Sequence, residues 1–417
     1  MKKNVERIKR CRFCKKSGLK IFLKLRPMPK PNAFLTSPHE EEPLYPLQIC
    51  RCNRCGLVQL THMVNPQEMF SHYLYMSSMS QMMLKHFEDS AAKLVNYSPT
   101  KDKPLVIDIG SNDGSFLKAF QRQKVNVLGV DPAKNIARKA QNEGVPTHND
   151  FFSKKTSEYI KKKYGFADLI VGVNVFAHID DLGDALEGVD LLLKNNGVLI
   201  MEFPYLVDLI ENNEFDTIYH EHRYYFLLKP VAWILEKNGF EVFDCERFSI
   251  HGGTIRLYVK RIGDTRYTVS AKVTDLYKQE VKKKMYIQKT YDDFAKRIYK
   301  MKDDLLKVLH RLKSQNKRII GYGASAKGNV LLNFCGIGPE LIDYIVDSTP
   351  YKQGLFTPGT HIPVLPEDQL LKDKPDYALL LIWNFKEEVF KKQKKFLANG
   401  SKFIIPVPRV EIISTKV

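Results

Sequence analysis

The chain has 417 residues, of which 44% are hydrophobic; it is too long for a single core and predicts two or three globular domains. No run approaches the roughly 18 apolar residues of a membrane span, and the N-terminal segment lacks the apolar region of a signal peptide, so we expect a cytoplasmic protein without a membrane partner. The 65 Lys and Arg residues outnumber the 47 Asp and Glu residues, which gives a net charge of +18.

This positive charge fits either a nucleic acid or a phosphorylated substrate. Nucleic-acid-binding proteins cluster their basic residues or interleave them with aromatic residues. The long basic run over residues 272–297 instead contains acidic residues, as a solvated helix face does. We therefore expect no nucleic-acid partner and favour a positive cleft for a diphosphate-linked substrate.

The first 68 residues contain two C-x-x-C pairs, Cys11 with Cys14 and Cys52 with Cys55, separated by 37 residues. Each pair can give two thiolates to one tetrahedral ion, and four sulfur ligands make a closed structural zinc site without a place for a catalytic water. The alternative is disulfides, which a reducing cytoplasm disfavours. The proline-rich segment between the pairs is expected to loop out, and Cys50 to be a packed or free thiol.

Residues 69–95 are predicted to hold a loop followed by a helix. The helix is indicated by apolar residues at helical spacing, namely Met82, Met83, Phe87, Ala91 and Leu94. His72, Tyr73 and Tyr75 precede it in the loop. A tyrosine at such a place serves packing more often than chemistry, so the sequence leaves the role of Tyr73 open.

The stretch over residues 105–117, LVIDIGSNDGSFL, joins a buried strand to a helix through a loop bounded by Gly110 and Gly114. In an open α/β sheet the crevice beyond the carboxyl end of a strand holds the cofactor, and glycines let the backbone approach it. A second strand follows over residues 125–130 and ends in Asp131, which can accept both hydroxyls of a ribose. The pattern therefore predicts a nucleoside pocket.

Two cofactors use such a pocket, a nicotinamide dinucleotide and S-adenosylmethionine. The dinucleotide motif is G-x-G-x-x-G, with helix N-terminal amides facing a pyrophosphate. Here the loop reads G-x-x-x-G and brings two acids, Asp108 and Asp113, which repel a pyrophosphate and suit an ammonium or a sulfonium group. The sequence favours S-adenosylmethionine, with a dinucleotide or a purely structural turn as alternatives.

Residues 104–261 alternate strands with helices until the last two strands, which follow each other through Gly252 and Gly253. An open sheet that ends in an antiparallel hairpin is typical of class I methyltransferases. Asp150 follows the third strand, where the adenine would lie, and Asn174 and His178 follow the fourth strand into the same crevice. The strands are expected at 104–109, 125–130, 145–147, 167–173, 197–202, 241–246 and 254–260.

Residues 216–226 contain two histidines, two acids and three tyrosines. The pattern is not H-E-x-x-H and has no evident third ligand, so a metal is disfavoured. A histidine that acts as a general base, with acid and phenol groups in support, fits better because imidazole titrates near neutral pH. A purely structural cluster is the alternative.

The remaining chain is predicted to be a helical linker over residues 271–315, in one or two helices, followed by a second α/β unit. That unit opens with Gly321-x-Gly323-x-x-Ala326, and Asp347 stands where a ribose acid belongs. Lys327 favours a phosphate-facing loop over NAD binding or a structural turn. Further strands are expected near 377–382 and 402–406.

Six motifs in this order resemble the three-domain, S-adenosylmethionine-dependent sugar C-methyltransferases of deoxysugar pathways, which methylate C-3 of nucleotide-linked 4-keto-6-deoxy sugars. The motifs are the paired C-x-x-C module, IGSNDG (109–114), FAHIDD (176–181), YHEHRYYF (219–226), HGGTIRLYV (251–259) and GYGASAKGN (321–329). The resemblance covers nearly the whole chain. It implies a zinc module (1–68), a class I methyltransferase Rossmann-like domain (69–265) and a Rossmann-like domain that closes over the sugar nucleotide (266–417).

The resemblance also implies roles for individual residues. His222 would be the base that removes the C-3 proton, Tyr219 and Glu221 its supports, and Tyr73 and His178 further site residues that help to stabilise the enolate. S-Adenosylmethionine would be bound by Asp108, Gly110, Asn112, Asp113, Gly114, Asp131, Asp150 and Asn174, and the substrate by Tyr224 and Lys327. The nucleotide carrier, the sugar stereochemistry and the choice between monomer and homodimer stay open.

Three other functions remain as alternatives. An O- or N-methyltransferase would use the same cofactor on another small molecule. A zinc-knuckle nucleic-acid-binding protein would use the cysteine module and the positive charge. An NAD-dependent sugar oxidoreductase would use the second glycine loop.

Overall fold

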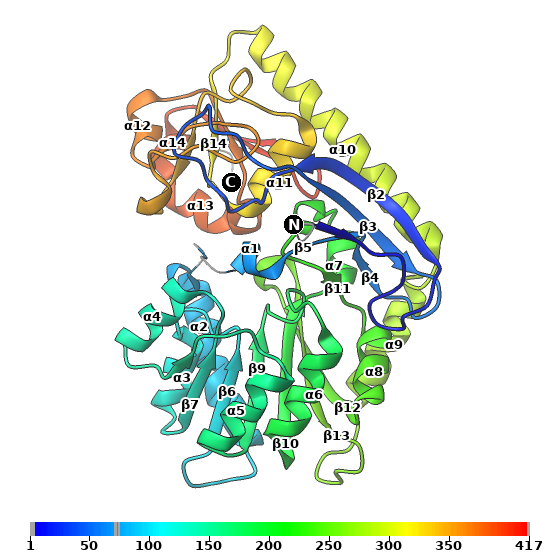
Figure 1. Ribbon diagram of the computed structural model, residues 1–417. Helices are drawn as coiled ribbons and strands as arrows, with labels where there is room; N and C mark the ends of the chain where they lie inside the picture. Colours follow the sequence, from blue (N-terminus) through cyan, green and yellow to red (C-terminus); the bar gives the residue numbers. More distant parts are fainter. Residues whose placement is uncertain (1–4, 71–72, 74–75, 415–417) are drawn as a thin grey trace.

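The structure, a computed structural model, describes residues 5–70, 73 and 76–414, so that His72 and Tyr75 lie outside the described residues. Its strands form sheets of four, seven and six strands and one two-stranded pair. In Figure 1 the seven-stranded sheet fills the lower half, the six-stranded sheet lies above it, and the N-terminal strands lie beside both. Among the helices of these residues, none combines the length and apolar character needed to cross a membrane.

The N-terminal module is an antiparallel sheet in the order β11-β4-β3-β2. Its strands are β2 (Leu19–Met28), β3 (Tyr45–Cys52), β4 (Val58–Leu60) and, from far along the chain, β11 (Tyr224–Tyr225). Beside it β1 (Val5–Arg7) pairs with β5 (His62–Val64). The proline-rich segment loops out only between β2 and β3, because Pro27 is accommodated inside β2 at a break in its register with β3.

The central sheet has the order β12-β13-β10-β9-β6-β7-β8. Only β13 and β12 run antiparallel to their neighbours, as the hairpin at Gly252 and Gly253 predicts, and this topology confirms the predicted fold class. The strands are β6 (Leu105–Ile109), β7 (Asn126–Val130), β8 (Thr147–His148), β9 (Ala167–Val173), β10 (Leu193–Pro204), β12 (Phe240–Phe248) and β13 (Thr254–Arg261).

Helices cover both faces of this sheet and bury one apolar side each. They are α3 (Ser115–Arg122), α4 (Lys134–Asn142), α5 (Lys154–Tyr164), α6 (Leu182–Leu192), α7 (Leu206–Glu211) and α8 (Leu228–Lys237), preceded by α1 (Pro66–Phe70) and α2 (Gln81–Leu94). In α2, which starts at the Ser80 cap, Met83, Phe87, Ala91 and Leu94 are buried as predicted. Met82, which was also used to predict this helix, lies within it and is 38% exposed.

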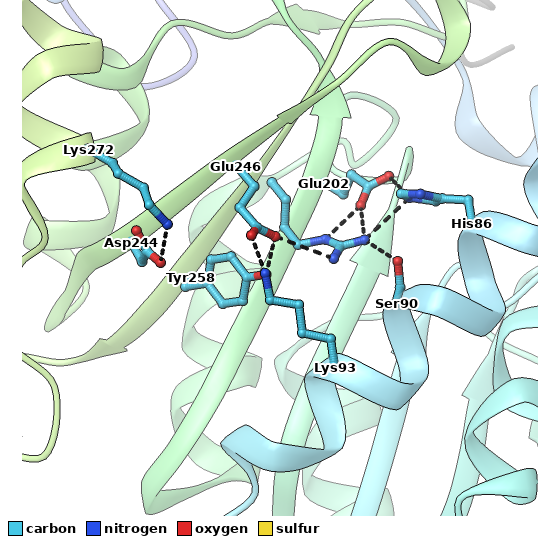
Figure 2. Close-up of polar contacts among 9 residues, drawn as sticks. His86, Ser90, Lys93, Glu202, Asp244, Glu246, Tyr258 and Lys272 are labelled. Atoms are coloured by element: carbon cyan, nitrogen blue, oxygen red, sulfur yellow. Dashed lines mark hydrogen bonds and ion pairs between the residues drawn. The ribbon is translucent and has the colours of Figure 1, made fainter.

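A buried polar network fastens α2 to the central sheet (Figure 2). The carboxylate of Glu202, on β10, lies 2.7 Å from His86 Nε2 of α2 and accepts a 2.8 Å hydrogen bond from Arg256 Nε of β13. The Arg256 guanidinium also donates to Ser90 Oγ. Charges without water are tolerated only when paired, so this network fixes the position of α2.

The linker forms two helices, α9 (Ala271–Lys282) and α10 (Gln288–Ser314), as one of the two predicted arrangements has it. A six-stranded sheet in the order β16-β15-β14-β17-β18-β19 follows, parallel except for β19. Its elements are β14 (Ile319–Tyr322), α11 (Ala326–Cys335), β15 (Ile345–Asp347), β16 (Val364–Pro366), α12 (Gln369–Asp373), β17 (Tyr377–Leu380), α13 (Lys386–Lys392), α14 (Lys394–Ala398), β18 (Lys402–Ile405) and β19 (Glu411–Ile413). Strands β16 and β19 were not predicted, because three residues are too few to show the alternating pattern of a strand.

We expect Glu202→Leu to destabilise the protein by about 3–5 kcal/mol, because it leaves the buried Arg256 guanidinium without its close partner and with only Glu246, at 4.0 Å, as a counter-charge. The midpoint of urea denaturation measures the loss. The double variant Glu202→Leu/Arg256→Leu should recover most of it. Asp89→Asn, which breaks an exposed ion pair with Lys85 on the same helix, is the control and should leave the midpoint unchanged. Equal losses in the control and in Glu202→Leu would contradict the role of burial.

Candidate active site

A cavity of about 880 Å³ lies beyond the carboxyl ends of β6, β7 and β9 and is closed on its other side by the C-terminal unit. A volume of this size is in the range of ligand pockets. Nine of the predicted site residues line it, namely Tyr73, Gly110, Asn112, Asp131, Asn174, His178, Tyr219, His222 and Lys327. The other predicted residues outside the zinc module, all within the described chain, are not among its lining: Asp108, Asp113, Gly114, Asp150, Glu221 and Tyr224.

One end of the cavity is formed by the loop after β6. Gly110 has φ +68°, and a Cβ there would lie 2.5 Å from Val175 Cγ2, so only glycine fits. The Asp131 carboxylate accepts hydrogen bonds of 2.9 Å from the backbone N–H groups of Asn112 and Ala133. Burial raises the pKa of Asp131 to about 6. A carboxylate fixed at the edge of a glycine loop can accept ribose hydroxyls.

Three further predicted residues lie behind the lining of the cavity, namely Asp108 at the end of β6 and Asp113 and Gly114 in the loop. Burial, and next the charge of Asp131, raise the pKa of Asp108 well above its ordinary value. Asp113 accepts a 2.6 Å hydrogen bond from Ser115 Oγ and a 3.1 Å bond from Ser78 N. A Cβ on Gly114 would lie 2.9 Å from Val145 Cγ2. These residues shape the loop from behind.

After β8, where the sequence predicts the adenine to lie, the cavity is lined by Phe151 and Phe152, next to Asp150. The Asp150 carboxylate accepts a 2.8 Å hydrogen bond from Phe151 N and so orders this turn. At the end of β9, Asn174 adopts φ +56° and donates its backbone N–H to Glu202 O at 2.8 Å. Glu202 of the sheet thus holds the backbone of Asn174, which lines the cavity, while its side chain anchors α2.

His222 lines the cavity and has a defined tautomer. Its Nδ1 lies 2.8 Å from the backbone carbonyl oxygen of Thr217, which can only accept a hydrogen bond. The neutral ring therefore carries its proton on Nδ1 and its basic lone pair on Nε2. The rings of Tyr219 and His178 lie 4.1 and 4.9 Å from the His222 ring, between centroids.

His178 is held neutral at the same place. Its pKa is lowered well below the ordinary value by burial, and further by electrostatic interaction with His222 and Arg223. The backbone joins the two histidine segments, since Arg223 N donates to Ala177 O at 2.7 Å. A neutral imidazole beside a basic one can donate an N–H to a developing oxyanion.

Glu221 is buried behind the cavity and contacts it through Tyr73. Its carboxylate accepts 2.7 Å hydrogen bonds from the Tyr73 hydroxyl and from Asn32 Nδ2. Burial raises the pKa of Glu221, while these two hydrogen bonds and the charge of Lys30 lower it. Glu221 therefore acts on the cavity by directing the Tyr73 hydroxyl.

The other members of the 219–226 segment lie in the protein core. His220 Nε2 lies 3.2 Å from Tyr45 O, and burial lowers the pKa of His220 to about 4. Tyr224 belongs to β11 and donates its hydroxyl to Asp180 O at 2.8 Å. Tyr224, predicted as a substrate contact, therefore lies in the sheet of the zinc module rather than at the lining of the cavity.

The C-terminal unit repeats the acid arrangement of the central sheet. Asp347, at the end of β15, accepts hydrogen bonds of 2.7 Å from Ala324 N and 2.8 Å from Thr349 N. Asp131 likewise accepts one hydrogen bond from its glycine loop, at Asn112 N, and one from the backbone two residues later, at Ala133 N. Both acids line the one cavity. The second loop thus has the geometry of a nucleoside pocket facing the first.

Two lysines accompany this second loop. The Lys327 ammonium lies 5.1 Å from the centre of the Trp383 ring and lowers the pKa values of Glu214 and Asp216, which burial raises. Lys352 Nζ donates to Ala324 O at 2.9 Å. Both lysines line the cavity and offer positive charge to an anionic ligand.

The four cysteines of the C-x-x-C pairs meet at one point, with all four Sγ atoms within 4.8 Å of one another. Zinc bonded to four sulfurs at about 2.3 Å gives sulfur–sulfur distances of about 3.8 Å, so the group fits zinc. Gln59 Nε2 donates to Cys11 Sγ at 3.2 Å, as a thiolate ligand requires. Cys50 is a buried free thiol, as predicted.

The lining residues that sequence reasoning missed include Asn32 and Lys352. Asn32 was taken as part of a loop that extends outward, and Lys352 belongs to no motif. The sequence carries no signal for Asn32, because its partner Glu221 is 189 residues away. Lys352 could have been found from its position in the sequence, since it stands only five residues after Asp347, the acid that occupies the ribose-binding position of the second loop.

Three family models match the chain. A zinc binding domain matches residues 11–70, a methyltransferase domain residues 83–244, and a C-methyltransferase C-terminal domain residues 249–408. The C-methyltransferase NovU of Streptomyces niveus is 35% identical over 375 residues, which cover 90% of this chain and 89% of that protein.

Two more distant similarities concern parts of the chain. The ubiquinone biosynthesis O-methyltransferase of Rhodopseudomonas palustris is 26% identical and covers 35% of this chain and 53% of its own length. The crystal structure of an S-adenosylmethionine-dependent methyltransferase from Archaeoglobus fulgidus is 16% identical, covers 43% of this chain and 94% of that chain, and has a TM-score of 0.36.

We expect Cys55→Ser to lose the zinc and to lower the melting temperature by roughly 5 °C or more, because metal binding stabilises the folded module. Elemental analysis gives the zinc content per chain, and calorimetry the melting temperature. Cys50→Ser is the matched control, since this neighbouring thiol lies outside the four-sulfur group, and it should retain one zinc. Full zinc content in Cys55→Ser would refute the assignment of this ligand.

We expect the affinity for S-adenosylhomocysteine to weaken about tenfold between pH 7.5 and pH 5. The pKa of Asp131 is raised to about 6, so its carboxylate accepts ribose hydroxyls above that pH and loses its charge as the pH falls through it. Titration calorimetry across this range measures the effect. In Asp131→Asn the affinity should be lower and independent of pH. A pH dependence that persists in this variant would assign the effect to another group.

Proposed function

Because the chain belongs to the S-adenosylmethionine-dependent C-methyltransferases with an N-terminal zinc-binding domain, we propose that it deprotonates C-3 of a nucleotide-linked 4-keto-6-deoxy sugar and methylates the resulting enolate. The observation that carries the proposal is the tautomer of His222. Its Nδ1–H donates to Thr217 O, so Nε2 has the lone pair of a general base at the cavity.

The cofactor end of the cavity fits S-adenosylmethionine. Gly110 leaves room that a Cβ would fill, Asp131 offers its carboxylate to the ribose, and Phe151 and Phe152 offer apolar surface to the adenine. Asn112 and Asn174 complete the proposed contacts. Bound there, S-adenosylmethionine supplies an electrophilic methyl group, which C-3 of the enolate takes while the sulfur leaves as a neutral thioether.

The residues around His222 suit the formation of an enolate. A ketone at C-4 acidifies the C-3 proton, so that Nε2 of His222 can take it while the C–H electron pair moves into the enolate. The developing charge lies on the C-4 oxygen, and hydrogen-bond donors placed at it lower the barrier. Neutral His178 and the Tyr219 phenol, both beside the His222 ring, are the proposed donors.

The C-terminal unit is the proposed site of the nucleotide diphosphate. Asp347 repeats the ribose-type geometry of Asp131, and Lys327 and Lys352 bring positive charge to the same lining. Helix α11 is capped at its N-terminus by Ser325, which lines the cavity, and a helix N-terminus favours anions. A sugar linked to a diphosphate held there lies between this unit and His222.

We expect His222→Gln to reduce methyl transfer by about 10²–10⁴-fold while the dissociation constant for S-adenosylhomocysteine stays within twofold. The assay uses dTDP-, GDP-, UDP- and CDP-linked 4-keto-6-deoxy sugars with deuterium at C-3, followed by mass spectrometry. The wild-type protein should wash out the label, and His222→Gln should retain it. Retention of deuterium in a methylated wild-type product would favour transfer to a heteroatom instead.

The matched control is His220→Gln. His220 lies two residues away, packs on Tyr45 and does not line the cavity. Its loss should lower the melting temperature without preventing the washout of label. Equal loss of washout in both variants would show that the segment, rather than the His222 base, is responsible.

A further inference from the structure

The loop between β2 and β3, residues 29–44, is here called the strap because it crosses from the zinc module to the C-terminal unit. Leu35 and Phe356 exchange two backbone hydrogen bonds of 2.9 and 2.8 Å, as neighbouring strands do. The side chain of Asn329, on α11, donates to Pro31 O at 2.7 Å. Asn329 is 1% exposed, so this contact lies inside the interface. The C-terminal unit therefore holds the strap on both sides of residue 32.

Asn32, held between these two points, has its side chain at the active site. Its Nδ2 donates to Glu221 Oε1 at 2.7 Å, and the residue lines the cavity. The other oxygen, Oε2, accepts the Tyr73 hydroxyl at 2.7 Å. Glu221 is 2% exposed, so these two donors replace water on its carboxylate. One donor comes from the strap and the other from the segment before α2.

The arrangement fixes the direction of the Tyr73 hydroxyl. A phenol has a single hydrogen, and here it is directed to Glu221, so Tyr73 presents oxygen lone pairs on its other side. An amide N–H₂ group donates and does not accept, so Asn32 favours the anionic carboxylate. If Glu221 were protonated, its own O–H would donate towards Tyr73, and the Tyr73 hydrogen would turn away.

We propose that Asn32 is a positioning residue, whose amide keeps Glu221 as the acceptor of the Tyr73 hydroxyl while the C-terminal unit holds the strap. Which reaction this arrangement supports rests on the proposed function. The chain of contacts from Asn329 through Pro31 and Asn32 to Glu221 is independent of that function. The C-terminal unit thereby affects the reaction indirectly, because it holds the strap that brings Asn32 to Glu221.

The first test follows the Glu221 carboxyl group in the zinc-loaded protein without substrate. Carbon-13 NMR of protein labelled at the glutamate carboxyl carbon measures its titration, and Glu221→Gln assigns the resonance. Burial raises the pKa of Glu221, and the hydrogen bonds from Tyr73 and Asn32 and the charge of Lys30 oppose this. In Asn32→Leu the apparent pKa should rise by about one unit. An unchanged titration would overturn the proposal, whatever the substrate.

Asn32→Asp is the second variant and protects the test against misfolding, since it keeps the shape of the side chain. It places a second carboxylate against Glu221, so the apparent pKa should rise further than in Asn32→Leu. In each variant the acidic limb of the plot of kcat against pH should move to higher pH by as much as the pKa of Glu221 rises in that variant, because less Glu221 is anionic at a given pH. A purely structural loss would lower kcat equally at every pH, and that result would also overturn the proposal.

The coupling to the C-terminal unit is tested by Asn329→Asp, which removes the donor to Pro31 at a residue that does not line the cavity. It should raise the Glu221 pKa in the same direction, and its effect should not add to that of Asn32→Leu in the double variant. Asn238→Asp, at a helix end where the amide donates to Ile234 O, is the matched control and should not move the pKa. Additive effects would overturn the coupling.

The two proposals fail separately. If Asn32→Leu shifts the titration of Glu221 but the wild-type protein never washes out a C-3 deuterium, the sugar reaction is wrong and the positioning role stands. If the wild-type protein washes out the label but the titration does not respond to Asn32, the positioning role is wrong and the reaction stands.

Discussion

The pairing of the two-residue strand β11 with β4 is the contact on which the arrangement of the active site depends. It inserts Tyr224 and Tyr225 into the sheet of the zinc module, although they come more than 150 residues after it. Immediately before this strand, Arg223 N donates to Ala177 O of the central domain. The 219–222 segment is thus held between two sheets, which explains how a short irregular stretch can present His222 in one orientation and tautomer.

The zinc site contributes to this arrangement from a distance. Arg12, inside the first cysteine pair, donates to Asp180 Oδ1 at 2.9 Å, and Arg223 contacts the same oxygen. Asp180 follows the His178 motif. A metal that fixes the first pair therefore also fixes Arg12, and with it one end of the segment that carries His178. Its role in the site is geometric rather than chemical, because its four ligand positions are all filled by protein sulfur.

The sequence predicted those parts of the protein that local patterns determine. The strands of the central sheet, the glycine loop at Gly110 and the four-cysteine group follow from periodicity or spacing, and the structure has them at nearly the predicted residues. The contacts of Asn32 and Tyr224 could not be predicted, since each joins segments far apart in the chain and neither residue stands in a periodic pattern. Predicting the site from sequence fails where the site is assembled from separate units.

The distribution of charge shows a related limit. A net charge of +18 predicts a positive cleft, yet the lysines of the second loop are accompanied by carboxylates, Lys327 by Glu214 and Asp216, and Lys352 by Asp347. The charge of this region is therefore close to balanced, and an anionic ligand must compete with fixed acids. Burial raises the pKa of Glu214 to about 7, which brings its titration towards neutral pH. Protonation of Glu214 would leave more of the Lys327 charge for an anionic ligand, so the acids behind the cleft affect binding together with the lysines that face it.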